Sequence, residues 1–289
     1  YPNKKIIQEQ SAMPDRITSC GKISVPGSYH LTNDLTSASA VTCLKIHDTK
    51  DVFINCNNYT IAMDLAGGAT TKPVIEIKNV NNLSLESCVI KITNNTSNWP
   101  LYLMKISHLT NSTFTNNTFG DNYEVVDVEN SSNLQVRNNH FISPYQQNRS
   151  NNNLIENNIF DPVQRKEAGA APIISNYGSG NIIRKNTVDG KSDGIYENRL
   201  GFDDGIMIRN ESNDLIEANS LKNFFDCGIE TAEFIQNTRI IGNNIKNAGI
   251  CGIGGWYWNS WKGNTVSRNT VDTAPSFFVF FHAYGLRPQ

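Results

Sequence analysis

A recurring asparagine phrase constrains the fold of this chain more than any other feature. Each copy has an asparagine, often doubled, then one residue and then an apolar one, as in Asn116-Asn117-Thr118-Phe119. Taking the asparagine next to the apolar pair as the marker, the copies fall at Asn117, Asn139, Asn158, Asn186, Asn219, Asn244 and Asn269. The gaps are 22, 19, 28, 33, 25 and 25 residues. Self-similarity at such a period is typical of a solenoid.

The repeating unit has the character of β-structure. Short alternating apolar stretches precede most markers, for example Leu134-Gln135-Val136 and Arg239-Ile240-Ile241. Such runs, interrupted by Asn, Gly and Ser, predict short strands joined by turns. Leucine-rich repeats would need regularly spaced leucines and a helical half, which are missing. The sequence therefore predicts an all-β, right-handed parallel β-helix of about 25 residues per coil with terminal caps.

Asparagine suits the corners of such coils. It tolerates the left-handed backbone conformation of a tight turn, and its amide can bond the backbone or the next coil. We expect the stacked asparagines to form a hydrogen-bonded column, which is a structural role. We also expect one domain over 1–289, with a cap and first strands at 1–35, coils at 36–271 and a last coil or cap at 272–289.

Composition excludes two kinds of partner. The net charge is −2 and no run of Lys or Arg stands out, so we expect no nucleic-acid partner. No apolar run reaches 18 residues, so we expect no transmembrane segment. The chain begins at Tyr1 and not Met, as a processed mature protein or a trimmed chain would.

Six cysteines permit disulfides without fixing their pairing. Cys227 and Cys251 both precede Gly-Ile, so we expect them at equivalent places in neighbouring coils. We favour buried packing of these two side chains, with a disulfide as the alternative. No Cys-x-x-Cys or His-rich cluster indicates a metal site. Asn-x-Ser/Thr sequons, as at Asn58 and Asn210, permit glycosylation.

Residues 17–61 carry a more specific order of segments. They include Val-Pro-Gly-Ser-Tyr-His-Leu at 25–31, Cys-Leu-Lys-Ile at 43–46 and Val-Phe-Ile-Asn-Cys-Asn at 52–57. This order resembles the opening coils of the carbohydrate-binding and sugar-hydrolase β-helix group, which is pectate-lyase-like. That group includes the periplasmic copper-site maturation protein of nitrous oxide reductase. The chain departs from it at one turn, with Asn55 and Asn58 where Asp and Gly are usual.

The resemblance implies the β-helix fold and a secreted or cell-surface location. It does not imply one activity, because the group contains lyases, epimerases, hydrolases, accessory proteins and surface-layer components. A role in metal-site maturation would rest on the resemblance alone. The absence of a His/Cys/Met ligand cluster from the sequence counts against that role.

Acidic residues indicate where chemistry would take place. Residues 189–203 lengthen one coil, and lengthened loops on a rigid scaffold commonly carry sites. Aligning the repeated Gly-Ile phrases predicts that Asp203 lies beside Asp226 and that Met207 lies beside Glu230. Adjacent coils are about 4.8 Å apart, so the like charge of the two aspartates would raise one pKa.

Two enzyme classes fit these residues. A glycoside hydrolase would use Asp203, Asp204 and Asp226 to protonate the leaving oxygen and to activate water. A polysaccharide lyase would need a basic residue, and Ca²⁺ held on acidic residues would neutralise the charge of a uronate. The residues available to a lyase are Arg209, Lys222, Asp203, Asp226 and Glu230.

Other features argue against particular enzymes. The alginate-type epimerase segment Asp-Pro-His-Asp is absent, as are the polygalacturonase signatures Asn-Thr-Asp and Gly-His-Gly. Asp before Gly is also common at turns for backbone reasons, and Asp193-Gly194 repeats that pattern in the lengthened coil. The acids therefore have a structural interpretation beside the catalytic one.

Aromatic residues gather near the carboxyl end. Trp256, Tyr257, Trp258 and Trp261 fall in one short stretch, and flat exposed aromatics suit stacking on sugars. The alternative is that they cover a coil. The apolar run Phe277–Leu286, which contains His282, predicts a last coil or cap, or a surface that docks on another copy. Ile6-Ile7 and Met13-Pro14 would belong to the other cap.

The sequence thus favours an exported surface protein that binds carbohydrate, or assembles as a structural component or filament. The runner-up is a polysaccharide lyase or glycoside hydrolase that uses the acidic residues of the later coils. We expect no cofactor, apart from Ca²⁺ in the case of a lyase.

Overall fold

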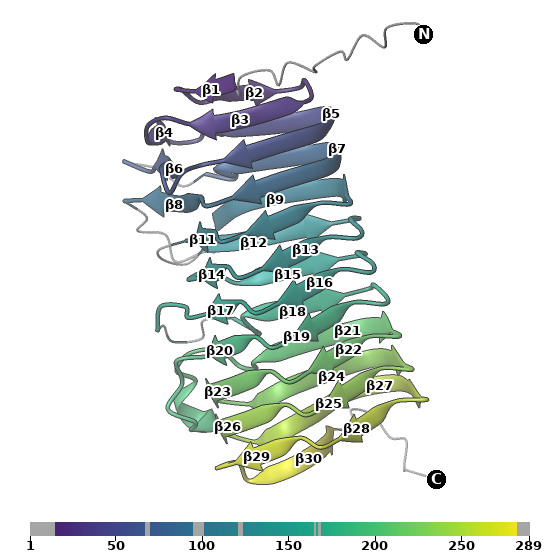
Figure 1. Ribbon diagram of the computed structural model, residues 1–289. Helices are drawn as coiled ribbons and strands as arrows, with labels where there is room; N and C mark the ends of the chain where they lie inside the picture. Colours follow the sequence, from purple (N-terminus) through teal and green to yellow (C-terminus); the bar gives the residue numbers. More distant parts are fainter. Residues whose placement is uncertain are drawn as a thin grey trace, which may run out of the picture.

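Short strands wind around one axis from the amino end to the carboxyl end of the chain (Figure 1). The computed structural model describes residues 15–66, 70–94, 101–120, 124–164, 166 and 169–281. Every pairing between named strands is parallel, and each strand pairs with its counterparts one coil before and one coil after it, as from Ile206 to Ile229 to Ile253. The fold is a right-handed parallel β-helix, as predicted. Of the proposed caps at 1–35 and 272–289, residues 1–14 and 282–289 lie outside the described residues.

Three faces make up each coil. The first face contains β2 (Gly21–Ile23), β5 (Leu44–Asn55), β7 (Ile75–Glu86), β9 (Leu101–Thr110), β12 (Glu124–Glu129), β15 (Tyr145–Asn148), β18 (Ile173–Asn176), β21 (Ile206–Ser212), β24 (Cys227–Gln236), β27 (Cys251–Lys262) and β30 (Ser276–Phe281). The second face contains β1 (Asp15–Ile17), β3 (Gly27–Leu31), the later halves of β5 and β7, β10 (Thr113–Thr115), β13 (Gln135–Arg137), β16 (Leu154–Glu156), β19 (Ile182–Arg184), β22 (Leu215–Glu217), β25 (Arg239–Ile241) and β28 (Thr265–Ser267).

The third face is a separate sheet of shorter strands. It contains β4 (Leu35–Ser37), β6 (Thr60–Asp64), β8 (Val89–Thr93), β11 (Thr118–Phe119), β14 (His140–Phe141), β17 (Ile159–Phe160), β20 (Thr187–Asp189), β23 (Ser220–Phe224), β26 (Asn244–Ala248) and β29 (Thr270–Asp272). One short 3₁₀ helix, η1 (Tyr196–Asn198), lies in the lengthened coil. Among the described residues, no helix is long and apolar enough to cross a membrane.

The core is a column of identical side-chain types stacked coil upon coil. On the first face, Ile46, Ile77 and Ile106 occupy one register position and are fully buried. On the third face, the ring of Phe141 stacks on the rings of Phe119 and Phe160 at centroid distances of 4.6 Å. Because side chains alternate along a strand, fixing these inward residues also fixes which side chains point to solvent.

The asparagine column exists and marks the corner before the third face. Each side-chain amide donates to the side-chain oxygen of the next asparagine at 2.9–3.0 Å. The column consists of Asn117, Asn139, Asn158, Asn186, Asn219, Asn243 and Asn269. Asn244, the marker chosen in the sixth copy of the phrase, was therefore wrong by one residue. Asn243 is buried, whereas Asn244 is exposed as the first residue of β26.

The left-handed turn belongs to the residue before each column asparagine. Asn116, Asn138 and Asn157 have φ between 55° and 57°. In later coils Lys185, Ala218 and Gly242 hold the equivalent place, also at positive φ. The doubled asparagine thus combines two roles, because the first residue turns the chain and the second bonds the next coil.

Three disulfides join neighbouring coils: Cys20–Cys43, Cys56–Cys88 and Cys227–Cys251. Cys227 and Cys251 do occupy equivalent register positions. Our preference for buried packing without a bond between them was wrong. The parallel register brings the two Cα atoms to 4.6 Å, within the range of about 4.4–6.8 Å that a disulfide spans.

Replacing Asn243 with alanine is expected to destabilise the protein strongly. Its side chain accepts from the backbone N–H and the amide of Asn219 and donates to the carbonyl of Ile216, so these buried groups would lose a partner. A buried polar group left unpaired costs about 1–3 kcal/mol. Urea denaturation would measure the loss. Asn244→Ala, at the exposed neighbour, should change stability by less than about 0.5 kcal/mol; the reverse order would contradict the observed column.

Candidate active site

The lengthened coil places two aspartates directly before β21 and leads to a third before β24. The backbone N–H of Asp226 donates to the carbonyl of Asp203 at 2.9 Å, so these residues are neighbours in successive coils. Met207 pairs in register with Glu230. Both juxtapositions match the prediction from the repeated Gly-Ile phrases. We call Asp203, Asp204, Asp226 and Glu230 the acid cluster.

Burial and mutual repulsion act together within the acid cluster. Carboxyl oxygens of Asp204 and Asp226 lie within 4.8 Å of one another, and both residues are buried. Asp203 and Glu230 are only half-buried. Burial first, and then the charge of Asp203, raises the pKa of Asp226 to about 7. Burial, followed by the charges of Asp226 and Asp203, raises the pKa of Glu230 to about 8.

Asp204 is the interior member of the acid cluster. Its Oδ1 accepts the backbone N–H of Cys227 at 3.1 Å, and its carboxyl group hydrogen-bonds that of Glu230. Burial raises the pKa of Asp204 well above its ordinary value, and the charge of Glu230 adds to this effect. This hydrogen bond lowers the pKa of Glu230, so Asp204 is the donor and Glu230 the acceptor.

Arg199 is the residue near the acid cluster that sequence analysis missed. Its charge lowers the pKa of Asp226 and so opposes the effect of burial. The guanidinium lies 5.3 Å from the ring centroid of Tyr196, and that ring lies 6.4 Å from the ring of Phe225. The only sequence signal was its place in the lengthened coil, which runs past β23 to β26 in Figure 1.

The two basic residues proposed for a lyase have other partners. Arg209 Nε donates to Glu233 Oε1 at 2.6 Å, and this bond raises the pKa of Arg209. Arg209 still lowers the pKa of Glu230 by its charge. Lys222 lies on β23 of the third face, with Nζ 3.3 Å from Asp189 Oδ2. The structure therefore groups Arg209, but not Lys222, with the acid cluster.

The proposed aromatic platform is divided by the structure. Trp256 is half-buried. It pairs with Ala232, which pairs with Arg209, so Trp256 continues this outward row one coil beyond the acid cluster. Trp261 instead packs against the core, with its ring 6.3 Å from that of Phe278. It is only partly buried, and its proposed role in sugar binding stays a prediction. The side chains of Tyr257 and Trp258 lie outside the described residues.

Within the described part of the chain, one group of side chains has the spacing of metal ligands. It consists of Asp204, Asp226 and Cys227. Cys227 is bonded to Cys251 and offers no thiolate. Ca²⁺ takes about six to eight oxygen ligands, so the two carboxylates would supply a small part of its shell. The Ca²⁺ of a lyase stays a prediction.

A second buried carboxyl pair shows that a raised pKa alone does not make a site. Burial and the charge of Glu211 raise the pKa of Asp214 to about 9. Asp214 accepts the backbone N–H of Asn181 at 2.8 Å, and Glu211 accepts from Ser175 Oγ at 2.8 Å. Both acids lie inside the solenoid at 4% and 1% exposure. They therefore serve the corner hydrogen bonds, whereas Asp203 and Glu230 reach solvent.

Comparison with known proteins agrees with this geometry at the level of the fold. The family profile described as right handed beta helix region matches residues 145–285. The chain is a right-handed parallel β-helix. No curated protein matches its sequence.

Solved β-helices align over most of the chain. The periplasmic alginate epimerase AlgG aligns over 90% of this chain and 76% of its own, with a TM-score of 0.54 and 11% identity. The A-module of a mannuronan C-5 epimerase from Azotobacter vinelandii aligns over 94% of this chain and 86% of its own, with a TM-score of 0.46 and 12% identity. A polygalacturonase from Erwinia carotovora ssp. carotovora aligns over 89% of this chain and 86% of its own, with a TM-score of 0.43 and 10% identity. Likeness at these identities shows the fold and not the activity.

The acid cluster should make stability fall as pH rises. Asp226 and Glu230 have ordinary pKa values of 3.8 and 4.5, and their folded values are about 7 and 8. The folded chain therefore holds more protons than the unfolded chain between these limits, and its stability declines from about pH 4 to about pH 8. Glu230→Gln cannot ionise, so we expect a higher Tm than wild type at about pH 9 and a smaller difference near pH 4.

Asp193→Asn is the control for this experiment. Asp193 is exposed, and its pKa is lowered by hydrogen bonds from Asn198 and the backbone of Ile195. Its replacement should give no gain at high pH. Equal Tm profiles for Glu230→Gln and wild type would show that Glu230 is not held protonated.

Proposed function

We propose that this protein is an exported glycoside hydrolase that acts on a polysaccharide at the acid cluster. The observation that carries the proposal is the half-buried Glu230 beside Asp203 and Asp226, with its pKa raised by burial to about 8. A general acid must be protonated at the working pH and must reach the substrate. The partial exposure and the raised pKa of Glu230 support this role, whereas Asp204 is too deeply buried to reach a substrate.

The remaining members of the acid cluster complete the chemistry. Glu230 would give its proton to the glycosidic oxygen as the bond to the anomeric carbon breaks. Water would form the new bond to that carbon, and Asp203 would accept the proton of the water. Asp226 lies beside Asp203, and Arg199 partly offsets its charge. A carboxyl acid and a carboxylate base are the pair that glycoside hydrolysis uses.

A polar row on the first face supports an extended substrate. Asn148, Asn176 and Arg209 occupy one register position in successive coils. Asn176 Nδ2 donates to Asn148 Oδ1 at 3.1 Å, while Asn176 Oδ1 is buried without a hydrogen-bond partner. Side-chain amides and a guanidinium suit the hydroxyl groups of sugars. A polysaccharide lying along the solenoid axis would reach the acid cluster through this row.

The exported location has independent physical support. Six cysteines form three disulfides, and disulfides persist in oxidising compartments such as the periplasm, the cell surface and the medium. AlgG, the neighbour with the highest TM-score of those given above, is named a periplasmic alginate epimerase. We therefore place the protein outside the cytoplasm, as a secreted or surface protein that acts on a glycan.

Carbohydrate binding without cleavage is the second candidate. It is favoured by the position of Trp256, which continues the outer face beyond the acid cluster in the same register row as Arg209. A surface protein of this kind would hold the glycan on the polar row and leave it intact. Assembly through the apolar run at Phe277–Leu286 belongs to the same candidate, and residues 282–286 lie outside the described residues.

Reducing-end release from a panel of acidic and neutral polysaccharides separates the candidates. We expect activity in the wild type, a loss of about 10²–10⁴-fold in Glu230→Gln, and near wild-type activity in Asp193→Asn. Absorbance of unsaturated uronates that requires Ca²⁺ would instead establish a lyase. Retention of polysaccharide without any release of ends would leave the binding protein as the better account.

A further inference from the structure

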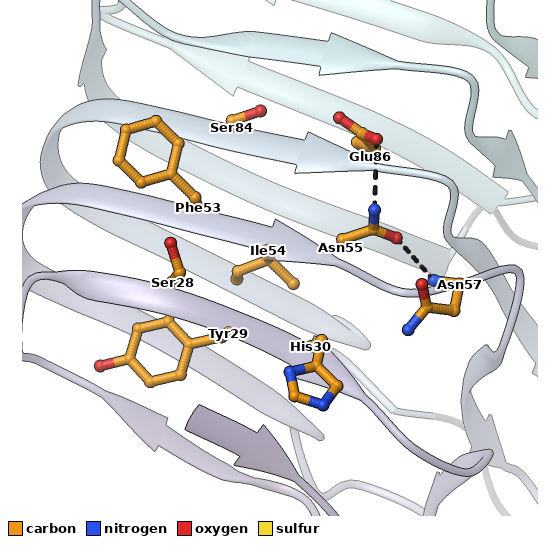
Figure 2. A pocket seen from close by; sticks show the side chains of 9 residues that line it. All are labelled: Ser28, Tyr29, His30, Phe53, Ile54, Asn55, Asn57, Ser84 and Glu86. Atoms are coloured by element: carbon orange, nitrogen blue, oxygen red, sulfur yellow. Dashed lines mark hydrogen bonds between the residues drawn. The ribbon is translucent and has the colours of Figure 1, made fainter. Parts of the chain in front are cut away.

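A pocket of about 450 Å³ lies on the second face near the amino end, formed by β3, β5 and β7 (Figure 2). This volume is within the range of about 300–1,000 Å³ that ligand pockets occupy. The pocket is separate from the acid cluster, because β5 reaches β21 through β7, β9, β12, β15 and β18. Six steps of about 4.8 Å make the separation roughly 29 Å along the axis.

The parallel register produces two outward rows in this pocket. Ser28, Phe53 and Ser84 form one row, in which a phenyl ring stands between two small hydroxyl residues. Phe53 is 46% exposed. Figure 2 shows the ring with Ser28 and Ser84 on either side. An exposed aromatic ring offers a flat apolar face to a ligand.

The other row is polar and prearranged. It contains His30, Asn55 and Glu86 in register. Asn55 Oδ1 accepts the backbone N–H of Asn57 at 2.8 Å, and Asn55 Nδ2 donates to Glu86 Oε1 at 3.2 Å. These bonds hold the amide and the carboxylate in place before any ligand arrives. A carboxylate has about four acceptor sites, so Glu86 keeps capacity for hydroxyl groups.

His30 supplies the group that lacks a partner. Its Nδ1 is buried and makes no hydrogen bond within the described residues. A buried polar atom without a partner costs free energy that a ligand hydroxyl would recover. Its side chain lines the pocket in the same row as Asn55 and Glu86 (Figure 2). The pocket therefore combines an apolar ring face with unfilled hydrogen-bonding sites.

We infer that this pocket binds a neutral pyranose ring of a polysaccharide. The C–H face of a sugar would cover Phe53, while its hydroxyl groups would bond the imidazole of His30 and the Glu86 carboxylate. An anionic uronate is disfavoured because the pocket presents the carboxylate of Glu86. The site holds no part of the acid cluster and stands whether or not the protein cleaves glycans. It would anchor one stretch of a polysaccharide at the amino end of the solenoid.

Affinity electrophoresis in soluble galactomannan, xyloglucan, mixed-linkage β-glucan and polygalacturonate tests this inference. All proteins would carry Glu230→Gln, so that cleavage does not obscure binding. We expect retardation by at least one neutral polysaccharide, and Phe53→Ala should weaken it at least about tenfold, which corresponds to 1.4 kcal/mol. His30→Ala should weaken it as well.

Ile159→Ala is the control, because Ile159 is a large apolar residue of similar exposure, 51%, on β17 of the third face. It should leave retardation unchanged, and equal Tm values would show that the variants fold alike. The inference is overturned if no neutral polysaccharide retards the protein, or if Phe53→Ala behaves like Ile159→Ala. Retardation by polygalacturonate alone that depends on Phe53 would overturn the neutral-sugar assignment.

Discussion

The buried hydrogen-bond column of asparagines is the interaction on which the rest of the molecule depends. Each column residue accepts from the backbone N–H one coil earlier and donates to the next side-chain oxygen, as at Asn158. A polar group buried at a corner must find such partners. These hydrogen bonds form only when each column asparagine lies directly over the next. Coils of unequal length therefore still stack with their corners aligned. The asparagine column therefore continues unbroken past the lengthened coil at 189–203.

Fixed register converts a linear pattern into surface chemistry. It brings Asp203 beside Asp226, although 23 positions separate them, and it places Phe53 between two serines at the other end. The acid cluster lowers the stability of the protein at high pH, because burying like charges raises the pKa values of the carboxyl groups. A scaffold that is stabilised elsewhere can tolerate this loss of folding free energy. Structural acids such as Asp214, which accepts a hydrogen bond at a corner of the coil, lower the stability at high pH in the same way.

Local patterns predicted the fold and the pairing of Asp203 with Asp226, since both follow from period and phase. The repeated phrase also picks out Asn243, which has one residue between it and Ile245, and the structure shows that Asn243, not the chosen marker Asn244, joins the column. Local patterns failed where the outcome depended on neighbours in space. Trp261 looked like a surface aromatic, but a register shift between Ala232 and Phe234 pairs it with Ile235 and packs it on the core. Sequence analysis missed Arg199 and wrongly grouped Lys222 with the acid cluster. The conformation of a loop, and the face on which a residue lies, leave no periodic signal in the sequence.

The sequence by itself determined a β-solenoid with coils of about 25 residues, stacked polar corners and acids in adjacent coils. These properties arise from repetition, which a linear pattern records completely. Only the tertiary structure decided the raised pKa of Glu230, the disulfide partners and the pocket around Phe53. Burial, distance and charge between residues in different coils set each of them, and those quantities exist only once the coils have stacked.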